Sequence, residues 1–387
     1  MKEELNQRIL KLQSRMQEKG IDGALIVYAI DVFYYAGTRQ NSMLLVPAAG
    51  SPVLFVRKSL TRALQESPLK DIRPFPSSKE MADFMGDNIR IVGLTFDVVP
   101  VQQYQYFTRL FPGKEFVDIS QINREIRSVK SPWEIEQMKK AADIQCRLFA
   151  QIPEFLKPGM SEIELAAEVE YRSRKLGTEG YIRLRAFNQE LFWGVISAGA
   201  NSTAPGFFDG PVSGQGLSKA FPQGASQSII KKNVPVIVDY VCIIYGYLID
   251  MTRIFVIGTL EQELERAYAT SLEIQDYLFK NLTPGRLGSE LFYGASKIAE
   301  EAGFGANFMG APGDQAKFVG HGVGLELDEL PVLAQGLDTP MLLNQTIALE
   351  PKFVFPGRGA VGIENTVAVS EKGAIRITEM DDAIVYI

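Results

Sequence analysis

Two aspartates interrupt an otherwise apolar stretch, and their spacing would place both on one face of a β-hairpin. The stretch is Val236–Arg253, VIVDYVCIIYGYLIDMTR, and the acids are Asp239 and Asp250. A turn centred between Ile244 and Tyr245 would set them directly opposite, and a turn one residue later would make them diagonal neighbours. Both arrangements bring their Cβ atoms to about 4.5–8 Å. Because two buried anions are costly without a positive partner, the pair predicts a metal site.

The C-terminal part of the chain offers a second pair of acids in the same arrangement. A turn centred on Gly357 would set Glu350 opposite Glu364 across a hairpin. The chain's one histidine, His321, lies among the glycines of residues 320–324, which permit close approach of the backbone. A single histidine excludes any mechanism that needs two imidazoles in one chain. Five potential ligands are therefore available.

Four carboxylates and one imidazole form an oxygen-rich, thiolate-free set of ligands. Such a set suits a paired site for manganese, iron, cobalt or zinc rather than a structural cysteine site for zinc. Four carboxylates would balance two divalent ions, and two ions about 3.5–4 Å apart can generate a hydroxide nucleophile at neutral pH. The alternative is an acidic cluster neutralised by Arg253, Arg358 or Lys352.

The elements that carry these ligands belong to an internal repeat. Residues 155–159 (FLKPG) recur as residues 281–285 (NLTPG), and at the same shift Gly177 meets Gly303. Each copy predicts a helix, a Pro-Gly turn, a second helix and a strand-rich stretch, so a duplication is indicated. The first copy begins with the capping box Ser131–Glu134, with proline at the first helical position. A second capping box begins at Ser161, and residues 201–233 are rich in Gly, Ser and Pro, which predicts a long functional loop.

A separate α/β domain is predicted upstream, over residues 1–125. A helix over residues 2–19 ends at Gly20, strands are expected at 23–28, 43–47, 53–56 and 91–94, and a helix is expected around 79–85. The duplicated region then occupies residues 126–387.

Composition narrows the class of protein further. The chain has 387 residues, 46% hydrophobic and 22% charged, with a net charge of −6, which argues against nucleic-acid and polybasic membrane partners. We expect no secretory signal, since MKEELNQRIL has no apolar core, and no membrane span. Two distant cysteines do not suggest a disulfide scaffold. A cytoplasmic enzyme is the resulting prediction.

These motifs resemble those of a known family. VDYVCIIYGYLIDMTRIFVIG resembles the D-x10-D-x-T-R segment of the pita-bread metallohydrolases, which include aminopeptidase P, prolidase and methionine aminopeptidase. GHGVGLELDELP resembles their histidine segment, LEP and GIENTV resemble their two glutamate segments, and REIRSVKSPWEIEQMKKAADI is similar to the junction that opens their catalytic domain. The resemblance is close over residues 126–387 and looser over the N-terminal part, which is similar to the creatinase/prolidase N-terminal domain.

The resemblance implies an α+β protein, in which that small α/β domain precedes a duplicated pita-bread catalytic domain, and a homodimer. It implies two divalent ions, manganese favoured over cobalt, zinc or iron. Glu350 is expected to shuttle the proton of a bridging water. The implied ligands are Asp239, Asp250, His321, Glu350 and Glu364.

The chain departs from the peptidases of that family around the pocket. Gly206, Lys317 and Asp328 stand where the family has histidines, and Gly362 where it usually has an arginine. Lys317 and Asp328 are therefore candidate substrate residues, although they could simply pair with each other. Tyr247 is a third candidate, with packing in the hairpin as the alternative. Glu326 and Glu329 are expected on a solvated face.

The leading hypothesis is a metal-dependent hydrolase of the Xaa-Pro aminopeptidase and prolidase type, acting on a small peptide. The replaced pocket residues leave a second hypothesis open, in which the same centre hydrolyses or eliminates a small non-peptide molecule. A third is a catalytically silent binding module that keeps its metal for stability.

Overall fold

The computed structural model describes residues 2–387, and the chain divides into two compact units. The first runs to Arg127 and also includes Arg185–Phe187, and the second comprises Ser128–Leu184 and Asn188–Ile387. The first break falls two residues after the boundary expected at 125. Sequence reasoning did not foresee that Arg185 would join the first unit, where its guanidinium lies 2.6 Å from Asp97 and 3.2 Å from Asp31.

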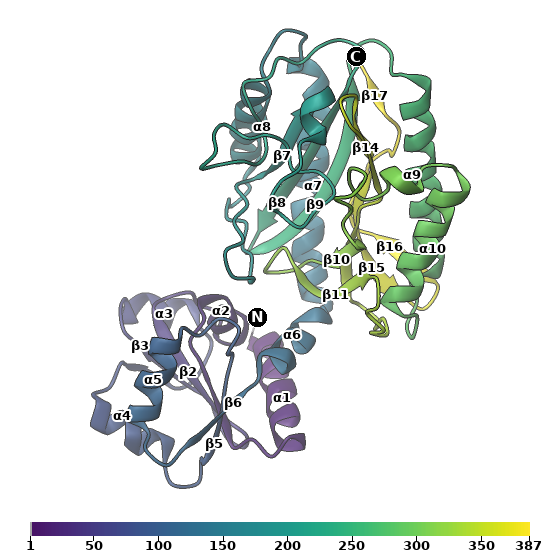
Figure 1. The fold of residues 1–387 in the computed structure, drawn as a ribbon. Coiled ribbons are helices and arrows are strands. Elements are labelled where there is room, and N and C mark those ends of the chain that lie inside the picture. Colours follow the sequence, from purple (N-terminus) through teal and green to yellow (C-terminus); the bar gives the residue numbers. More distant parts are fainter. Residues whose placement is uncertain (1) are drawn as a thin grey trace. The chain divides into compact units, whose positions relative to one another are not determined.

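The first unit is a six-stranded mixed sheet with strand order β4-β3-β2-β1-β5-β6, and its helices surround the sheet (Figure 1). The strands are β1 (Gly23–Ile26), β2 (Ser42–Pro47), β3 (Val53–Val56), β4 (Ile72–Pro74), β5 (Ile91–Leu94) and β6 (Glu115–Asp118). The helices are α1 (Lys2–Glu18), α2 (Ala29–Ala36), α3 (Leu60–Glu66), α4 (Ser78–Met85), α5 (Val101–Leu110) and α6 (Ser120–Ser128). Gly20 has φ +67° just after α1, as its predicted role requires. Strand β1 is shorter than predicted, because Tyr28 already precedes the first turn of α2.

The second unit contains a nine-stranded sheet and a two-stranded sheet. The path of the large sheet is β11-β10-β12-β15-β9-β8-β7, with β16 on β15 and β17 on β9, and β13 pairs with β14. Its strands are β7 (Gly194–Ala198), β8 (Pro235–Ile244), β9 (Tyr247–Val256), β10 (Phe318–Gly322), β11 (Glu329–Ala334), β12 (Thr346–Leu349), β13 (Lys352–Phe355), β14 (Gly359–Gly362), β15 (Glu364–Ser370), β16 (Gly373–Arg376) and β17 (Val385–Tyr386).

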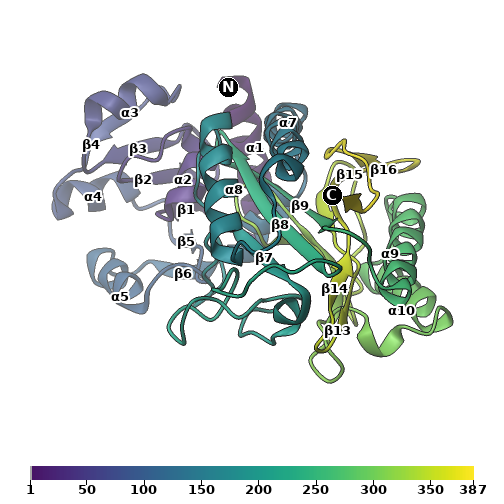
Figure 2. The ribbon, with the colours of Figure 1, turned by 90° about the horizontal axis from the view of Figure 1, so that it is seen from above.

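Two helix pairs cover the two halves of this unit, as the internal repeat predicts. They are α7 (Pro132–Phe155) with α8 (Glu162–Leu176), and α9 (Gln262–Asn281) with α10 (Gly288–Glu301). Figure 2 shows the first pair beside β7–β9, and α9 and α10 beside β13–β16. Each pair buries its own apolar cluster. Short 3₁₀ turns lie at Gly199–Thr203 and Gly305–Asn307.

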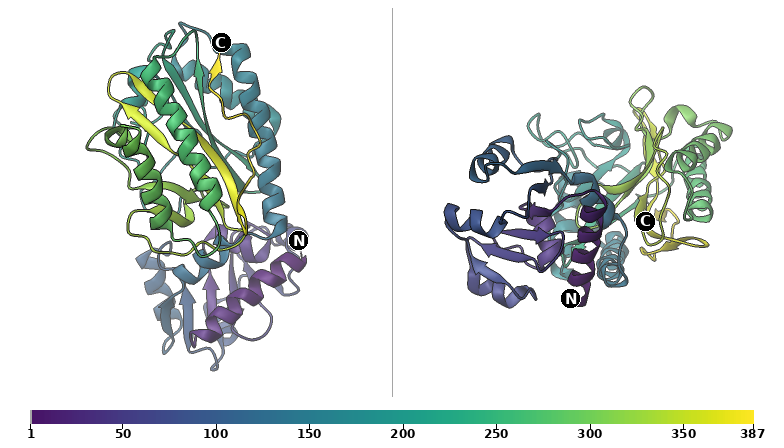
Figure 3. Two further views of the ribbon diagram at one scale, coloured as in Figure 1. Left: turned by 90° about the vertical axis from the view of Figure 1, so that its right-hand side faces the viewer. Right: turned by 90° about the horizontal axis from the view of Figure 1, so that it is seen from below.

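Local signals at the ends of these helices match the sequence predictions. Ser131 and Ser161 both form the predicted capping boxes at the starts of α7 and α8. Gly177 ends α8 with φ +106°, and its repeat partner Gly303 follows α10 with φ +82°. Figure 3 shows α7, α9 and α10 beside the long strands of this unit. None of the helices in residues 2–387 is both long and apolar enough to cross a bilayer.

The register of both acidic hairpins agrees with the spacing of the acids. Strands β8 and β9 pair Asp239 with Thr252 and Val241 with Asp250, which is the diagonal arrangement of the two aspartates. Strands β13 and β14 pair Lys352 with Gly362, as a turn centred on Gly357 requires. Strands β12 and β15 continue the same register beyond that hairpin.

Candidate metal centre

The alternation of β8 and β9 turns both aspartates away from α7 and α8. Val238, Tyr240 and Met251 belong to the apolar cluster under those helices. Successive side chains of a strand point to opposite faces, so Asp239 and Asp250 face the other side. There the main chain of Asp250 exchanges hydrogen bonds of 3.1 and 2.8 Å with the hydroxyl of Thr366 on β15.

The glutamates reach the same place from β12 and β15. Glu350 directly follows β12, and Glu364 begins β15 opposite Thr252 of β9. The hydroxyl of Thr252 donates a 2.7 Å hydrogen bond to Oε2 of Glu364. Both glutamates are buried. Sequence reasoning did not single out Thr252, although its place two residues after Asp250 puts it on the same face.

His321 lies on β10, between β11 and β12, with its ring held by the main chain. Its Nδ1 lies 3.0 Å from the carbonyl oxygen of Leu327, to which a neutral ring would donate a hydrogen bond. Its Nε2 lies 3.5 Å from Oε1 of Glu350 and 4.0 Å from Oε1 of Glu364. A ring fixed in this way presents Nε2 as a ligand for a cation.

Lys352 places an ammonium group inside the acidic cluster. Its Nζ lies 2.8 Å from Oδ2 of Asp239, 2.8 Å from Oε2 of Glu350 and 2.8 Å from Oε2 of Glu364. The side chain is 1% exposed. Of the three cations that the sequence offered as neutralising partners for the acidic cluster, Lys352 is the one that contacts its carboxylates. Arg253 instead donates to main-chain oxygens, Asn365 and Asp382, while Arg358 pairs with Glu261 and Glu263.

Burial and crowding shift the pKa values of the cluster. Burial and the neighbouring carboxylates raise the pKa of Asp250 well above its usual value, with Lys352 opposing them. The same causes raise the pKa of Glu364 to about 7. Burial works against the charge of Lys352, but the three carboxylates outweigh it and raise the pKa of the ammonium well above its usual value. Burial is likewise outweighed at His321, whose pKa is raised by Asp328, Glu350 and Glu364.

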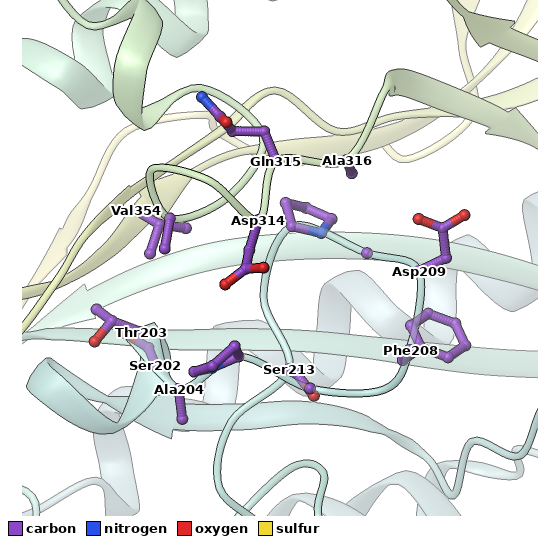
Figure 4. A pocket seen from close by; sticks show the side chains of 15 residues that line it. Ser202, Thr203, Ala204, Phe208, Asp209, Ser213, Asp314, Gln315, Ala316 and Val354 are labelled. Carbon is purple, nitrogen blue, oxygen red and sulfur yellow. The ribbon is translucent and has the colours of Figure 1, made fainter.

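One cavity of about 50 Å³ is lined by all five predicted ligands, by Lys352 and by Asp328. The long loop predicted over residues 201–233 forms part of its wall through residues 208–212. A second cavity of about 150 Å³ shares residues 208–211 with the first. Figure 4 shows this second cavity, with Asp314 between Val354 and Ala204 and with Asp209 beside Phe208.

The three candidate substrate residues occupy different environments. Asp328 lies in the site, with Oδ1 3.6 Å from Nδ1 of His321. Lys317 is exposed. Within residues 2–387, it is not among the residues that line the cavity of about 50 Å³. Tyr247 is buried, donates a 2.9 Å hydrogen bond to Glu134 and packs edge-on against Trp133. These contacts are those of the packing alternative for Tyr247.

The prediction of a solvated face at Glu326 and Glu329 is wrong. Both residues are buried. Oε2 of Glu329 lies 2.8 Å from the ammonium of Lys130, and its Oε1 accepts hydrogen bonds from the amides of Leu325 and Glu326. The ion pair joins residues 199 positions apart, so local charge patterning could not reveal it.

The donor set fits one divalent ion at the side of the cluster that faces His321. Asp250, His321 and Glu364 each offer a ligand atom, and these atoms lie within 4.8 Å of one another. Oδ1 of Asp250 is buried and has no hydrogen-bond partner among the residues described. A second ion does not fit where Lys352 lies, because the ammonium already contacts the oxygens that would bind it.

The fold and this cluster define the class of a metal-dependent hydrolase on a duplicated scaffold. Comparisons with known proteins agree. Residues 136–371 match metallopeptidase family M24, and residues 8–129 match the creatinase/prolidase N-terminal domain. The chain therefore belongs to metallopeptidase family M24. This membership confirms the predicted pita-bread fold and the prediction of a metal-dependent enzyme.

Individual relatives extend over the whole chain. A Xaa-Pro dipeptidase of Pyrococcus furiosus is 27% identical over 380 residues, covering 97% of this chain and 99% of its own. The solved structure of the prolidase from Pyrococcus horikoshii OT3 is 25% identical with a TM-score of 0.81, covering 98% of this chain and 100% of its own. A Xaa-Pro dipeptidase from Bacillus anthracis, 24% identical with a TM-score of 0.84, covers 99% and 100% and supports the fold.

Proposed function

We propose that this protein is a divalent-metal-dependent peptidase that hydrolyses small peptides with an Xaa-Pro bond. The observation that carries the proposal is the convergence of Asp250, His321, Glu350 and Glu364 on one cavity. Similarity to proteins named Xaa-Pro dipeptidase and prolidase supports the substrate class. Manganese is the proposed metal, and a cytoplasmic homodimer is the proposed state.

Four residues of the cluster, together with Thr252, have proposed roles in the hydrolysis. Asp250, His321 and Glu364 would hold a divalent ion, which would supply Lewis acidity. Glu350 takes a proton from the attacking water through Oε1, the oxygen that faces His321, and gives it to the departing amine. The water oxygen bonds to the carbonyl carbon as the C–N bond breaks. Thr252 fixes the orientation of Glu364 through its 2.7 Å hydrogen bond.

Steady-state hydrolysis of a panel of Xaa-Pro and Xaa-non-Pro dipeptides tests this proposal. We expect release of free amino acids with added Mn²⁺, loss of activity in chelator, and selectivity for proline. Glu350→Gln keeps an acceptor oxygen but removes the base, so kcat should fall roughly 10²–10⁴-fold. Glu371→Gln on the exposed turn after β15 is the matched control. Absence of turnover on every peptide and metal would refute the proposal.

The second candidate is hydrolysis or elimination on a small non-peptide molecule. Its support is the cavity of about 50 Å³, far below the roughly 300 Å³ at which ligand pockets begin. A dipeptide would need the loop at residues 208–211 to move and join the two cavities. Turnover of small amides or esters by a protein inactive on all peptides would favour this candidate.

A further inference from the structure

The two glutamates of the metal centre divide their oxygens between the ammonium of Lys352 and the imidazole of His321. Oε2 of Glu350 and Oε2 of Glu364 both contact the ammonium of Lys352. Oε1 of each is the atom nearest Nε2 of His321. Asp239 contributes only to the Lys352 side, through Oδ2. The hydrogen bonds of Lys352 within residues 2–387 go to the other three carboxylates, and Oδ1 of Asp250 is buried there without a hydrogen-bond partner.

The distances from Nζ of Lys352 to three carboxylate oxygens leave no room for a metal ion among the same three oxygens. Contacts of 2.8 Å to three carboxylates are typical of a charge-assisted hydrogen bond. They use all three N–H donors of the lysine. A divalent metal ion such as zinc binds carboxylate oxygens at about 2.0–2.2 Å. An ion placed among those three oxygens would therefore overlap Nζ.

The backbone opposite Lys352 leaves room for its stem. Gly362 pairs with Lys352 across β13 and β14. A Cβ at Gly362 would lie 2.8 Å from Cγ of Lys352, 2.6 Å from its Cα and 2.5 Å from the carbonyl oxygen of Pro351. The strand itself is held, since the amide of Met309 donates a 2.9 Å hydrogen bond to the carbonyl oxygen of Lys352. The absence of a side chain at Gly362 thus leaves space for the stem of Lys352.

We propose that the ammonium of Lys352 permanently replaces one of two metal ions, so that the centre binds a single divalent ion at Asp250, His321 and Glu364. The inference rests on the proposed function, because it concerns the same metal-dependent site. One ion and one ammonium supply +3 against four carboxylates, whereas two ions would supply +4. Lys352 is the internal counter-ion of Asp239, Glu350 and Glu364.

Metal content measured by elemental analysis and titration calorimetry tests the inference without any substrate. The wild-type protein, dialysed against Mn²⁺ and then against metal-free buffer, should retain about one ion per chain. Lys352→Met opens the second position and should retain about two. Lys372→Met removes an equal charge from an exposed turn and should match the wild type. Two ions per chain in the wild type, or none, would overturn the inference.

A second pair of variants addresses the same point if Lys352→Met does not fold without metal. Asp250→Asn removes a ligand that Lys352 does not contact, so the affinity for the single ion should fall roughly 100-fold or more. Asp239→Asn removes only a partner of Lys352, and the ion should stay bound. Equal losses in both variants would contradict the assignment, because a two-ion centre uses both aspartates.

The result is separable from the test of activity. One ion per chain without hydrolysis of any peptide would refute the proposed function and leave this inference standing. Peptide hydrolysis by a protein that holds two ions would do the reverse.

Discussion

Gly362 lies directly opposite Lys352 across the β13–β14 hairpin. Because glycine has no side chain, the stem of the lysine has room beside it. Both residues are buried. This relationship makes a test of the metal centre possible through a residue that carries no charge.

Gly362→Ala should destabilise the protein and disturb the metal centre together. The new Cβ would lie 2.5 Å from the carbonyl oxygen of Pro351 and 2.6 Å from Cα of Lys352, so the backbone has to move. Overpacking of this kind costs about 1–3 kcal/mol. Thermal unfolding measures the loss of stability, and metal content measures the displacement of Lys352. An unchanged melting temperature would show that the hairpin adapts and that Gly362 does not fix the lysine.

Tyr247→Phe should lower stability and leave catalysis unaltered. The hydroxyl of Tyr247 donates a 2.9 Å hydrogen bond to Glu134 at the start of α7. Loss of a hydrogen bond to a charged group costs about 1.5–3 kcal/mol. Denaturant unfolding measures this cost, and kcat and KM on the best substrate should stay at wild-type values. A raised KM with unchanged stability would instead support Tyr247 as a substrate residue.

Asp328→Asn should reduce turnover without changing metal content. Asp328 lines the cavity, and its Oδ1 lies 3.6 Å from Nδ1 of His321, so we expect a substrate in the cavity to meet this carboxylate. Lys317→Ala serves as the comparison, because Lys317 is exposed and we expect it to change kcat/KM much less. Kinetics and elemental analysis on the same samples decide the matter. Loss of the metal in Asp328→Asn would mean that Asp328 positions His321 rather than substrate.

The parts of the fold that local rules govern were predictable from the sequence. The even offset between Asp239 and Asp250, and the turn at Gly357, set the register of both hairpins because side chains alternate along a strand. The capping boxes at Ser131 and Ser161 begin helices where predicted because they satisfy amide groups within four residues.

The ion pairs between residues far apart in the chain could not be predicted from these local rules. Lys352 lies two residues after Glu350, but a flexible four-carbon stem can end in solvent or among carboxylates, and the sequence does not show which. Burial of Glu329 depends on Lys130, far away in the chain. Arg185, which is grouped with the first unit, likewise pairs with Asp31 and Asp97, both far from it in the chain.

Acid should destabilise the second unit, because low pH protonates the carboxylate of Asp382. Burial would raise the pKa of this carboxyl, but hydrogen bonding by Arg376 and Asn365 and the charge of Arg253 outweigh burial and hold the pKa below its usual value. A carboxyl with a depressed pKa in the folded state stabilises the fold above its unfolded pKa. That stability is lost as the pH falls below about 5.

Asp382→Asn should remove this dependence while lowering stability at neutral pH. The variant keeps an acceptor but leaves the buried Arg253 without its 3.1 Å ionic partner. Urea unfolding from pH 7 to pH 3 should therefore give a shallower acid limb for Asp382→Asn than for the wild type. Asp381→Asn is the matched control, because its side chain accepts only from the neighbouring amide of Ala383 among the hydrogen bonds described. Parallel acid limbs for Asp382→Asn and the wild type would show that another carboxyl governs the acid transition.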